Sequence, residues 1–327
     1  MKIPGRVYFF NPRIPPDGFP YAKNSMLLPE QVCDSLDKNP NTVIIDGYDF
    51  KPLLKNKDFI IKIIHELNVK VIIDFSCECI SSNVLYFLDN FKTLNNITII
   101  GNKGENIDFT PYLKKGLNLI EQPLFLTQIN QYTPYNNDSP VKKKYLLQIG
   151  KEKTERLALL GLLSYKGLLK YGHISYFKGK DNFGPDFFHD YSRLGFNKVE
   201  IEKINEGLSK IKGNLELDTK LLSFNTSHAR MYNSSYYHSS DFIVVCESDL
   251  YKPDFFTEKV GKCVQLNKNF ILLGGVGMVK NFIQFSNKYL NKDLSSLVNW
   301  CDIKYDNEDS VHNRIKLMIK EIEKSII

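Results

Sequence analysis

The sequence lacks most of the short motifs that assign an activity directly. Its six cysteines form no CxxC pair, which argues against a zinc site. The patterns HExxH, GxSxG and GxxxxGK[ST] are absent, which argues against a zinc protease, a serine hydrolase and a P-loop nucleotide triphosphatase. No GxGxxG follows the first apolar segment, so a dinucleotide-dependent oxidoreductase is excluded as well.

Signals for secretion and for membrane insertion are also lacking. Residues 1–19 contain no apolar stretch as long as the apolar region of a signal peptide, and no apolar run elsewhere reaches the length of a membrane span. The scattered cysteines are typical of a reducing compartment. We therefore expect a soluble cytoplasmic protein without membrane contact, located in the host cytoplasm if the chain is viral. The net charge of +6 is mildly basic and favours a phosphate-bearing ligand or nucleic acid only weakly.

The hydrophobic pattern predicts an α/β protein with two domains. Continuous apolar segments at 41–50, 69–75, 96–102, 145–150 and 242–246 alternate with segments of helical period, which is typical of parallel sheets. A chain of 327 residues is long for a single core. The polar segment 128–144, with two prolines and three lysines, is the candidate linker. We expect one domain over 1–140 and a second over 141–327.

The segment 242–277 carries the clearest chemical signal. A strand ends at Glu247, and a helix is expected to begin after Thr257 as its N-cap. The start of that helix would suit an anion, with Lys259 neutralising a diphosphate and Glu258 accepting hydrogen bonds from a ribose or a sugar. The alternative is that acids are simply common in a first helical turn and that Lys259 is a surface residue.

Other candidates also follow strands. Gly274 and Gly275 form a turn that permits a close approach of the backbone to a ligand, or a plain turn. Arg156 is expected in the first turn of a helix over 154–172 that Thr154 would cap, and its planar fork suits a diphosphate. Lys151 and Lys153 precede it, although a solvated charge run is the alternative.

A strand of the first domain also ends in acids. Asp74 closes the apolar segment 69–75, and Glu78 is expected beyond the strand end as a general base. Partial burial would raise the pKa of such a base into a useful range. The alternative is that both acids serve as capping or salt-bridge groups.

Residues 242–277 resemble the donor-site segment of fucosyltransferase-type inverting glycosyltransferases, and more closely that of glycosyltransferases from phages and large DNA viruses. The shared pattern is a strand ending in Glu, a T-E-K helix and an apolar strand running into a Gly turn. Lys262 matches the second lysine of the family pattern, whereas Cys263 and Asn269 replace its prolines. Upstream, Arg156 falls on the arginine of the family that contacts the donor diphosphate.

The resemblance implies a GT-B-like architecture, with two Rossmann-like domains facing a central cleft. The first domain would be the acceptor side, with Glu78 as catalytic base. The second would bind a nucleotide-diphospho-sugar through Arg156 and the segment 242–277, without a metal or other cofactor. The last helix would be free to pack back on the first domain. Lys151-Glu152-Lys153 departs from the Arg-rich loop of the family.

The sequence pattern does not identify the acceptor of the sugar. Hydroxymethylated pyrimidines in double-stranded phage DNA, a glycan and a protein are all compatible with the resemblance, and duplex DNA would require base flipping. A non-catalytic nucleotide- or glycan-binding protein of the same fold is the alternative to an enzyme.

Overall fold

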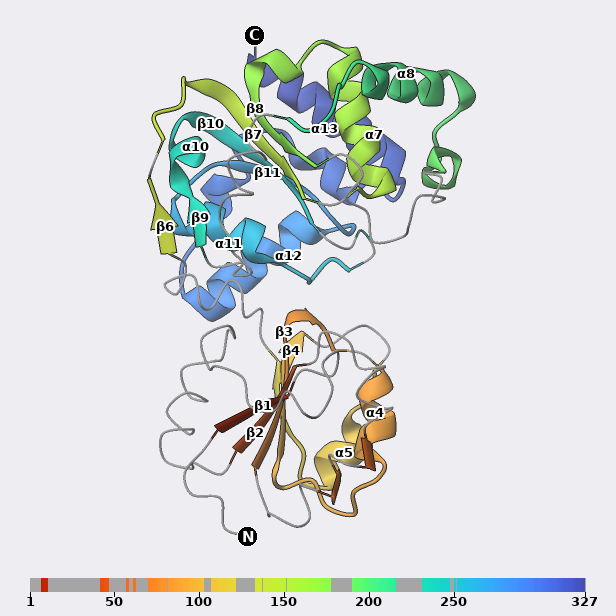
Figure 1. The fold of residues 1–327 in the computed structure, drawn as a ribbon, viewed down its shortest axis with the longest axis vertical. Coiled ribbons are helices and arrows are strands. Elements are labelled where there is room, and N and C mark those ends of the chain that lie inside the picture. The colour runs from red at the N-terminus through yellow and green to blue at the C-terminus, as the bar shows by residue number, and fades with distance from the viewer. Residues whose placement is uncertain are drawn as a thin grey trace. The chain divides into compact units, whose positions relative to one another are not determined.

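The computed structural model divides the chain into two compact units, Met1–Gln128 (unit 1) and Ile129–Ile327 (unit 2) (Figure 1). It describes residues 7–10, 42–46, 57–58, 61–62, 70–80, 82–102, 107–121, 133–136, 138–150, 152–177, 190–215, 231–247, 250 and 252–326. Both units contain parallel sheets with helices, so the predicted α/β class is confirmed. Within the described part of the chain, no helix combines the length and apolar character of a membrane span.

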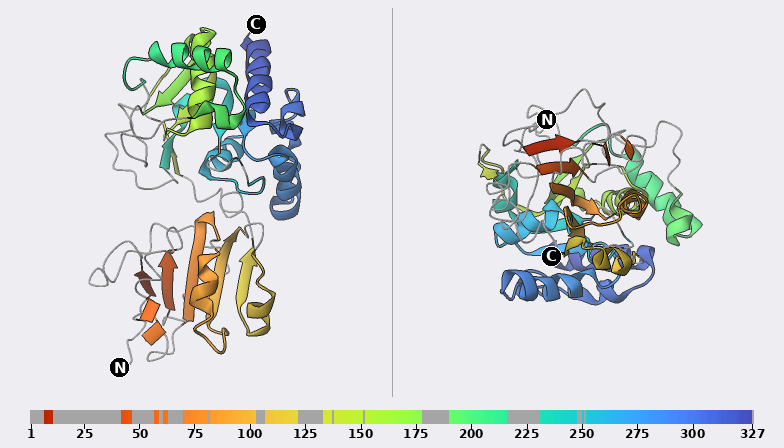
Figure 2. Two further views of the ribbon diagram at one scale, coloured as in Figure 1. Left: turned by 90° about the vertical axis from the view of Figure 1, so that its right-hand side faces the viewer. Right: turned by 90° about the horizontal axis from the view of Figure 1, so that it is seen from below.

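Unit 1 is built on a five-stranded parallel sheet whose strands follow each other in sequence order (Figure 2). The strands are β1 (Val7–Phe10), β2 (Thr42–Asp46), β3 (Lys70–Cys79), β4 (Ile97–Asn102) and β5 (Asn118–Glu121). The helices α4 (Asn83–Leu88) and α5 (Thr110–Lys114) follow β3 and β4. This order contains no reversal, whereas a doubly wound Rossmann sheet reverses its order once.

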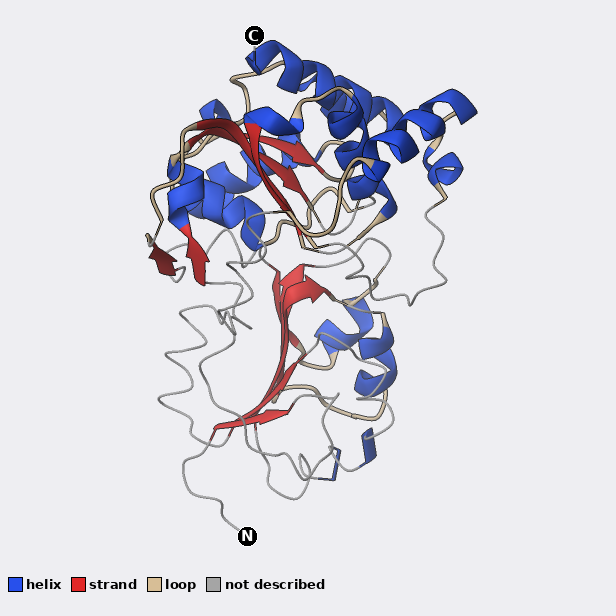
Figure 3. Ribbon diagram, turned by 45° about the horizontal axis from the view of Figure 1, so that its top comes forward, coloured by secondary structure: helices blue, strands red, loops and turns tan. Residues whose placement is uncertain are grey.

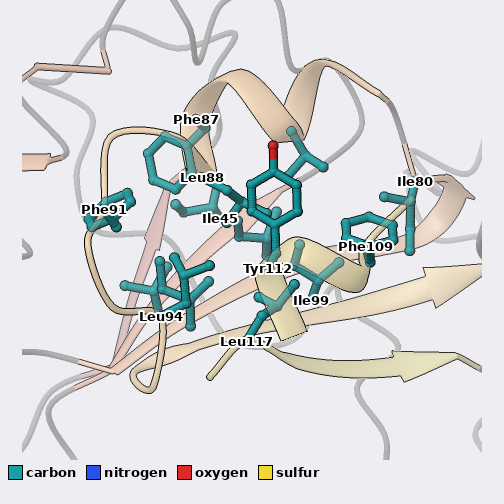
Figure 4. Close-up of a cluster of buried hydrophobic side chains, with 14 of the residues drawn as sticks. Ile45, Ile80, Phe87, Leu88, Phe91, Leu94, Ile99, Phe109, Tyr112 and Leu117 are labelled. Atoms are coloured by element: carbon teal, nitrogen blue, oxygen red, sulfur yellow. The ribbon is translucent and has the colours of Figure 1, made fainter. Parts of the chain in front are cut away.

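One face of this sheet and the two helices enclose a hydrophobic core (Figure 4). Alternate strand residues point into it, as the two-residue period of a strand requires. The strand and helix members are Val43, Ile45, Val71, Ile73, Phe75, Ile97, Ile99, Val84, Phe87, Leu88 and Tyr112. The intervening residues Ile44, Ile72 and Ile100 are also buried, so both sheet faces are covered, which explains why these strands are continuous apolar runs.

Unit 2 contains a four-stranded parallel sheet in the order β11-β10-β7-β8, with helices on both faces (Figure 3). Its strands are β7 (Lys143–Ile149), β8 (Gly172–Tyr176), β10 (Ser240–Cys246) and β11 (Phe270–Leu273). The α-helices are α7 (Thr154–Tyr165), α8 (Lys198–Ser209), α10 (Ser234–His238), α11 (Glu258–Gln265), α12 (Met278–Phe285) and α13 (Val311–Ile326). Short helical turns occupy Leu169–Tyr171, Tyr191–Leu194, Ser286–Leu290, Ser295–Leu297 and Ile303–Asn307.

The two units divide after Gln128, whereas the predicted domain boundary follows residue 140. The reason is a small parallel pair, β6 (Thr133–Tyr135) with β9 (Met231–Asn233), which joins part of the predicted linker to unit 2. Asn233 Nδ2 donates to Asp138 at 2.8 Å, and Ser234 Oγ donates to the Tyr135 carbonyl at 2.9 Å. The polar residues that suggested a flexible linker therefore hold this pair in place.

The helix predicted over 154–172 is shorter than expected. Its N-cap is Lys153 and it ends at Tyr165, followed by Gly167 in the left-handed conformation (φ 69°). Leu168 N donates to Leu163 O and Gly167 N donates to Ser164 O, both at 2.9 Å, which is the hydrogen-bond pattern of a Schellman motif. Gly167, rather than Gly172, therefore ends the helix.

The last helix lies where the hydrophobic pattern placed it. α13 packs within unit 2 against α7 and β11. Two ion pairs at 2.7 Å, Lys166 with Glu323 and Lys316 with Glu200, connect it to the end of α7 and to α8.

Candidate functional site

The strand order of unit 2 reverses between β7 and β10, and this is the natural place for a ligand. From β7 the chain moves outward to β8, then returns to the other side of β7 to form β10 and β11. Right-handed crossovers in opposite directions place α7 and α11 on opposite faces of the sheet, as Figure 1 shows. Ligands of open parallel sheets bind outside the carboxyl ends of the strands at such a switch point.

Arg156, from the first turn of α7, lies at this switch point. Its Nη2 donates to the carbonyl oxygens of Cys246 at 3.2 Å and Glu247 at 3.0 Å, at the carboxyl end of β10. The residue is only 4% exposed. The predicted functional arginine and the predicted strand end are thus brought together, although they are far apart in the sequence.

The charge of Arg156 has no counter-charge in the described structure. No carboxylate among the described residues lies within ion-pair distance of its guanidinium, and its buried Nε has no hydrogen-bond partner there. Burial of a charge is costly unless it is paired. The chemistry of the site is therefore suited to an anion that approaches the start of α7.

The start of α7 differs from the starts of α8, α10, α11 and α12, whose first-turn N–H groups bond to a side chain. Its N-cap residue is Lys153, which has no acceptor for the first-turn N–H groups. By contrast, α8 has a capping box formed by Asn197 and Glu200, and the Asp306 carboxylate accepts from Val279 N and Lys280 N at the start of α12. The positive end of the α7 dipole thus adds to the charge of Arg156.

Glu247 points inward and holds the start of α11. Its carboxylate is fully buried, accepting from Thr257 N at 2.9 Å and from Thr257 Oγ1 at 2.5 Å. Thr257 caps α11, as predicted, by accepting from Lys259 N at 3.4 Å. Glu247 was expected to hold a sugar. In this conformation it positions the helix start instead, because both of its carboxylate oxygens accept hydrogen bonds from Thr257.

The first turns of α11 add two positive charges, Lys259 and Lys262, and one negative charge, Glu258. Lys259 Nζ lies 3.7 Å from Glu247 and 3.6 Å from Glu258, and donates to Thr257 Oγ1 at 3.0 Å. Lys262 Nζ lies over the ring of Tyr232 at 5.4 Å. With Glu247 and Glu258 against Lys259 and Lys262, this cluster is balanced internally.

The pKa values of the cluster follow from burial and from these charges. Burial raises the pKa of Glu247, against the opposing effect of Lys259 and the Thr257 hydrogen bonds. Burial opposes ionisation of Glu258 too, but Lys259, Lys262 and hydrogen bonds to the carboxylate lower its pKa to about 2. Burial lowers the pKa of Lys262, although Glu258 partly offsets this. Glu258 is thus ionised at neutral pH.

Packing accounts for Gly274 and Gly275. A Cβ at Gly275 would lie 2.6 Å from Pro253 N, and one at Gly274 would lie 2.0 Å from Met278 Sδ. The Gly274 carbonyl accepts a hydrogen bond from Arg314 of α13. The close approach that these glycines permit is therefore between parts of the chain.

Glu152 and Tyr176 are a pair that the sequence analysis missed. Tyr176 closes β8, and its hydroxyl donates to the Glu152 carboxylate in the loop between β7 and α7. Burial, then the bond to Glu152, raises the pKa of Tyr176. The strand-end position of Tyr176 was the available signal, but nothing in the sequence connects it with Glu152.

Not every predicted residue can be placed at the site. Lys153 lies at the start of α7, whereas Lys151 falls outside the described residues. In unit 1, Asp74 is 3% exposed within β3. Glu78 lies inside β3 rather than beyond its end, because the strand continues to Cys79 with a shift in register after Asp74, and its side chain is outside the description.

Within the described residues, no group of three His, Cys, Asp or Glu side chains is arranged to hold a metal ion. Comparison of the chain with protein-family models, with curated proteins and with solved structures found no match.

Proposed function

We propose that unit 2 binds the diphosphate of a nucleotide-diphospho-sugar beside Arg156, and that the protein is a glycosyltransferase. The observation that carries this proposal is a buried guanidinium, at the switch point of a parallel sheet, that has no carboxylate within ion-pair distance among the residues that the structure describes. A diphosphate supplies the missing negative charge and matches the planar fork of arginine. The first-turn N–H groups of α7 would donate to the same anion.

The proposed reaction transfers the sugar with inversion. The acceptor hydroxyl attacks the anomeric carbon, the bond from that carbon to the diphosphate oxygen breaks, and a nucleoside diphosphate leaves. Arg156, with Lys151 and Lys153, would stabilise the charge that develops on the leaving group, which is a role that positive side chains can fill. In unit 1, Glu78 is proposed as the base that takes the hydroxyl proton, with Asp74 as the alternative.

Residues of α11 would complete the donor site. The ionised Glu258 carboxylate is proposed to accept hydrogen bonds from ribose or sugar hydroxyls, and Lys259 to contact the diphosphate. Glu247 would act through Thr257 as a positioning residue, since its carboxylate is enclosed. The acceptor is proposed as a hydroxyl of a glycan, a protein or a hydroxymethylated pyrimidine in DNA.

The test is nucleotide binding by the full chain. UDP- and GDP-sugars would be titrated by calorimetry against the wild type, Arg156→Met and the control Arg193→Met, whose side chain is 84% exposed. We expect Arg156→Met to weaken binding by about 10- to 100-fold, because a hydrogen bond to a charged group contributes about 1.5–3 kcal/mol. Arg193→Met should bind as the wild type does.

Two results would refute the proposal. One is that none of the nucleotide-sugars binds the wild type. The other is that folded Arg156→Met binds as tightly as Arg193→Met. Release of nucleoside diphosphate by the wild type, but not by Glu78→Gln, would distinguish an enzyme from a binding protein of the same fold.

A further inference from the structure

The opposite edge of the unit 2 sheet, where its strands begin, carries a row of lysines. Lys142, Lys143 and Lys144 lie at the start of β7, Lys170 lies in the turn before β8, and Lys268 lies just before β11. We call these five residues the basic edge. Since β11, β10, β7 and β8 are neighbours in this order, the lysines line the amino ends of the sheet from one side to the other.

The structure fixes these lysines without neutralising them. Lys143 Nζ donates to the Lys170 carbonyl at 2.7 Å, and Lys268 Nζ donates to the Ser240 carbonyl at 3.0 Å and the His238 carbonyl at 3.4 Å. Carbonyl groups orient an ammonium but leave its charge in place. Lys143 and Lys268 are therefore held by backbone carbonyl groups and keep their charge.

A single carboxylate faces this row among the described residues. Asp241 of β10 lies 3.1 Å from Lys142 Nζ and 3.7 Å from Lys144 Nζ, so two ammonium groups share it. Partial burial lowers the pKa of Lys268, an effect that Asp241 opposes and Lys142 reinforces. Five lysines against one carboxylate leave a strongly positive edge.

The basic edge is separate from the proposed diphosphate site. β7 has seven residues, so at about 3.3 Å per residue its two ends lie about 20 Å apart. A nucleotide-sugar beside Arg156 would not contact these lysines. The row itself spans four strands, which at about 4.8 Å between neighbours gives a width of about 14 Å.

We propose that the basic edge binds the phosphate backbone of a nucleic acid. The width of the row matches about four phosphates of one strand, at about 3.4 Å of helix axis each. Lysine side chains are flexible point charges, which suits phosphates that vary in position. Exposed Tyr171, with Lys170 Nζ 4.9 Å from its ring centre, adds an aromatic surface at the same edge.

An anionic membrane suits this surface less well. Surfaces that insert into the headgroup region combine basic residues with several large apolar side chains. Among the described residues of this edge, Val141 is the single aliphatic side chain with high exposure, at 78%. The proposal does not rest on the donor site, because it concerns other residues and a ligand other than the nucleotide-sugar.

The experiment compares two triple variants of equal charge. Lys142→Gln/Lys144→Gln/Lys170→Gln neutralises exposed lysines of the basic edge. The control, Lys198→Gln/Lys292→Gln/Lys320→Gln, neutralises exposed lysines elsewhere on unit 2. Binding of fluorescent duplex and single-stranded oligonucleotides to the full chain would be measured by anisotropy over a series of salt concentrations.

We expect the wild type to bind in a salt-dependent way. For the basic-edge variant, the slope of log K against log salt should become less steep by about 2 to 3. Each lost phosphate contact on duplex DNA contributes about 0.9 to this slope, and the variant neutralises three lysines. The control should keep the wild-type slope. Asp241→Asn should bind several-fold more tightly than the wild type, because it removes the one carboxylate at the edge, and this gain cannot arise from misfolding.

Three outcomes would overturn the proposal. They are no salt-dependent binding by the wild type, equal losses in both triple variants, and binding to phosphatidylserine vesicles without binding to either oligonucleotide. The nucleotide-sugar titrations stay a separate test, since the basic-edge variant should bind any donor as the wild type does.

Discussion

The hydroxyl of Thr257 is the strongest local determinant of how α11 begins. It donates to Glu247 Oε2 at 2.5 Å and accepts from Lys259 N at 3.4 Å, while both Thr257 and Glu247 are buried. Thr257→Val keeps the shape of the side chain and removes both of these interactions. The Lys259 ammonium also loses an acceptor, but it keeps Glu247 and Glu258 as neighbours. One oxygen of a buried carboxylate then loses its hydroxyl donor.

The expected cost follows from these two losses. A hydrogen bond to a charged group contributes about 1.5–3 kcal/mol, and an N-cap about 1 kcal/mol. The cap bond is long, so its share lies at the low end. We expect Thr257→Val to lower the free energy of unfolding by about 2–4 kcal/mol. Thr257→Ser is the matched control, because it keeps the hydroxyl and loses one methyl group, at about 1 kcal/mol.

Trp300 offers a direct assay. It is the only tryptophan of the chain, its ring lies 4.7 Å from that of Phe242, and its Nε1 donates to the Phe270 carbonyl at 3.2 Å. Its fluorescence during urea unfolding therefore follows the unit 2 sheet. With m values of about 2–3 kcal/mol/M, the midpoint should fall by about 1 M.

If Thr257→Val is no less stable than Thr257→Ser, the hydroxyl of Thr257 does not stabilise unit 2 and the prediction is wrong. A second check uses Glu247→Leu as the background. If the cost of Thr257→Val arises from the buried carboxylate, it should shrink in that background by about 1.5 kcal/mol or more. An unchanged cost would mean that the carboxylate is not involved.

Two further predictions concern packing and pH. Gly207→Ala should destabilise unit 2 by about 2 kcal/mol or more, because the new Cβ would lie 1.8 Å from the Gly161 carbonyl oxygen at the α7–α8 contact. Gly150→Ala is the control, because its Cβ meets no described atom within 4 Å. Equal urea midpoints for the two variants would contradict this prediction. For Glu247, burial raises the pKa in the folded state above the unfolded value of about 4.3. The stability that the protonated Glu247 contributes is therefore fully present below about pH 4.3, and it is lost as the pH rises through the folded-state pKa. Glu247→Gln should lack this loss, and parallel stability curves over about pH 4 to 7 would contradict it.

The fold was predictable where apolar periodicity is strong. β7 and β10 lie within a few residues of the predicted 145–150 and 242–246, because continuous apolar runs identify buried strands. α13 lies within one residue of the helical stripe over 310–326. The end of α7 was missed because apolar residues continue past Gly167. The β6–β9 pair was missed because its short polar strands are held by contacts far apart in the sequence.

Of the local structure around the candidate site, the helix cap was predictable, whereas the directions of side chains were not. Thr257 as the cap of α11 follows from residue type and spacing alone. The inward direction of the Glu247 carboxylate does not, because it depends on where the loop before α11 returns to β10. Likewise, the sequence cannot distinguish a glycine that admits a ligand from Gly275, which admits the backbone of Pro253.

The charges around the switch point indicate which side of it would receive the diphosphate. On the α11 side, Glu247 and Glu258 already face Lys259 and Lys262, so an added dianion would compete with carboxylates for the same ammonium groups. On the α7 side, Arg156 donates to carbonyl groups of the described residues, and Lys153 provides no side-chain cap for the helix start. Electrostatics therefore favours the main phosphate contacts at α7, with Lys259 in a lesser role, and hydroxyl groups at Glu258. On this basis, loss of Arg156 should weaken binding of the bare nucleoside diphosphate, whereas loss of Glu258 should matter most for the ribose or sugar portion of the donor.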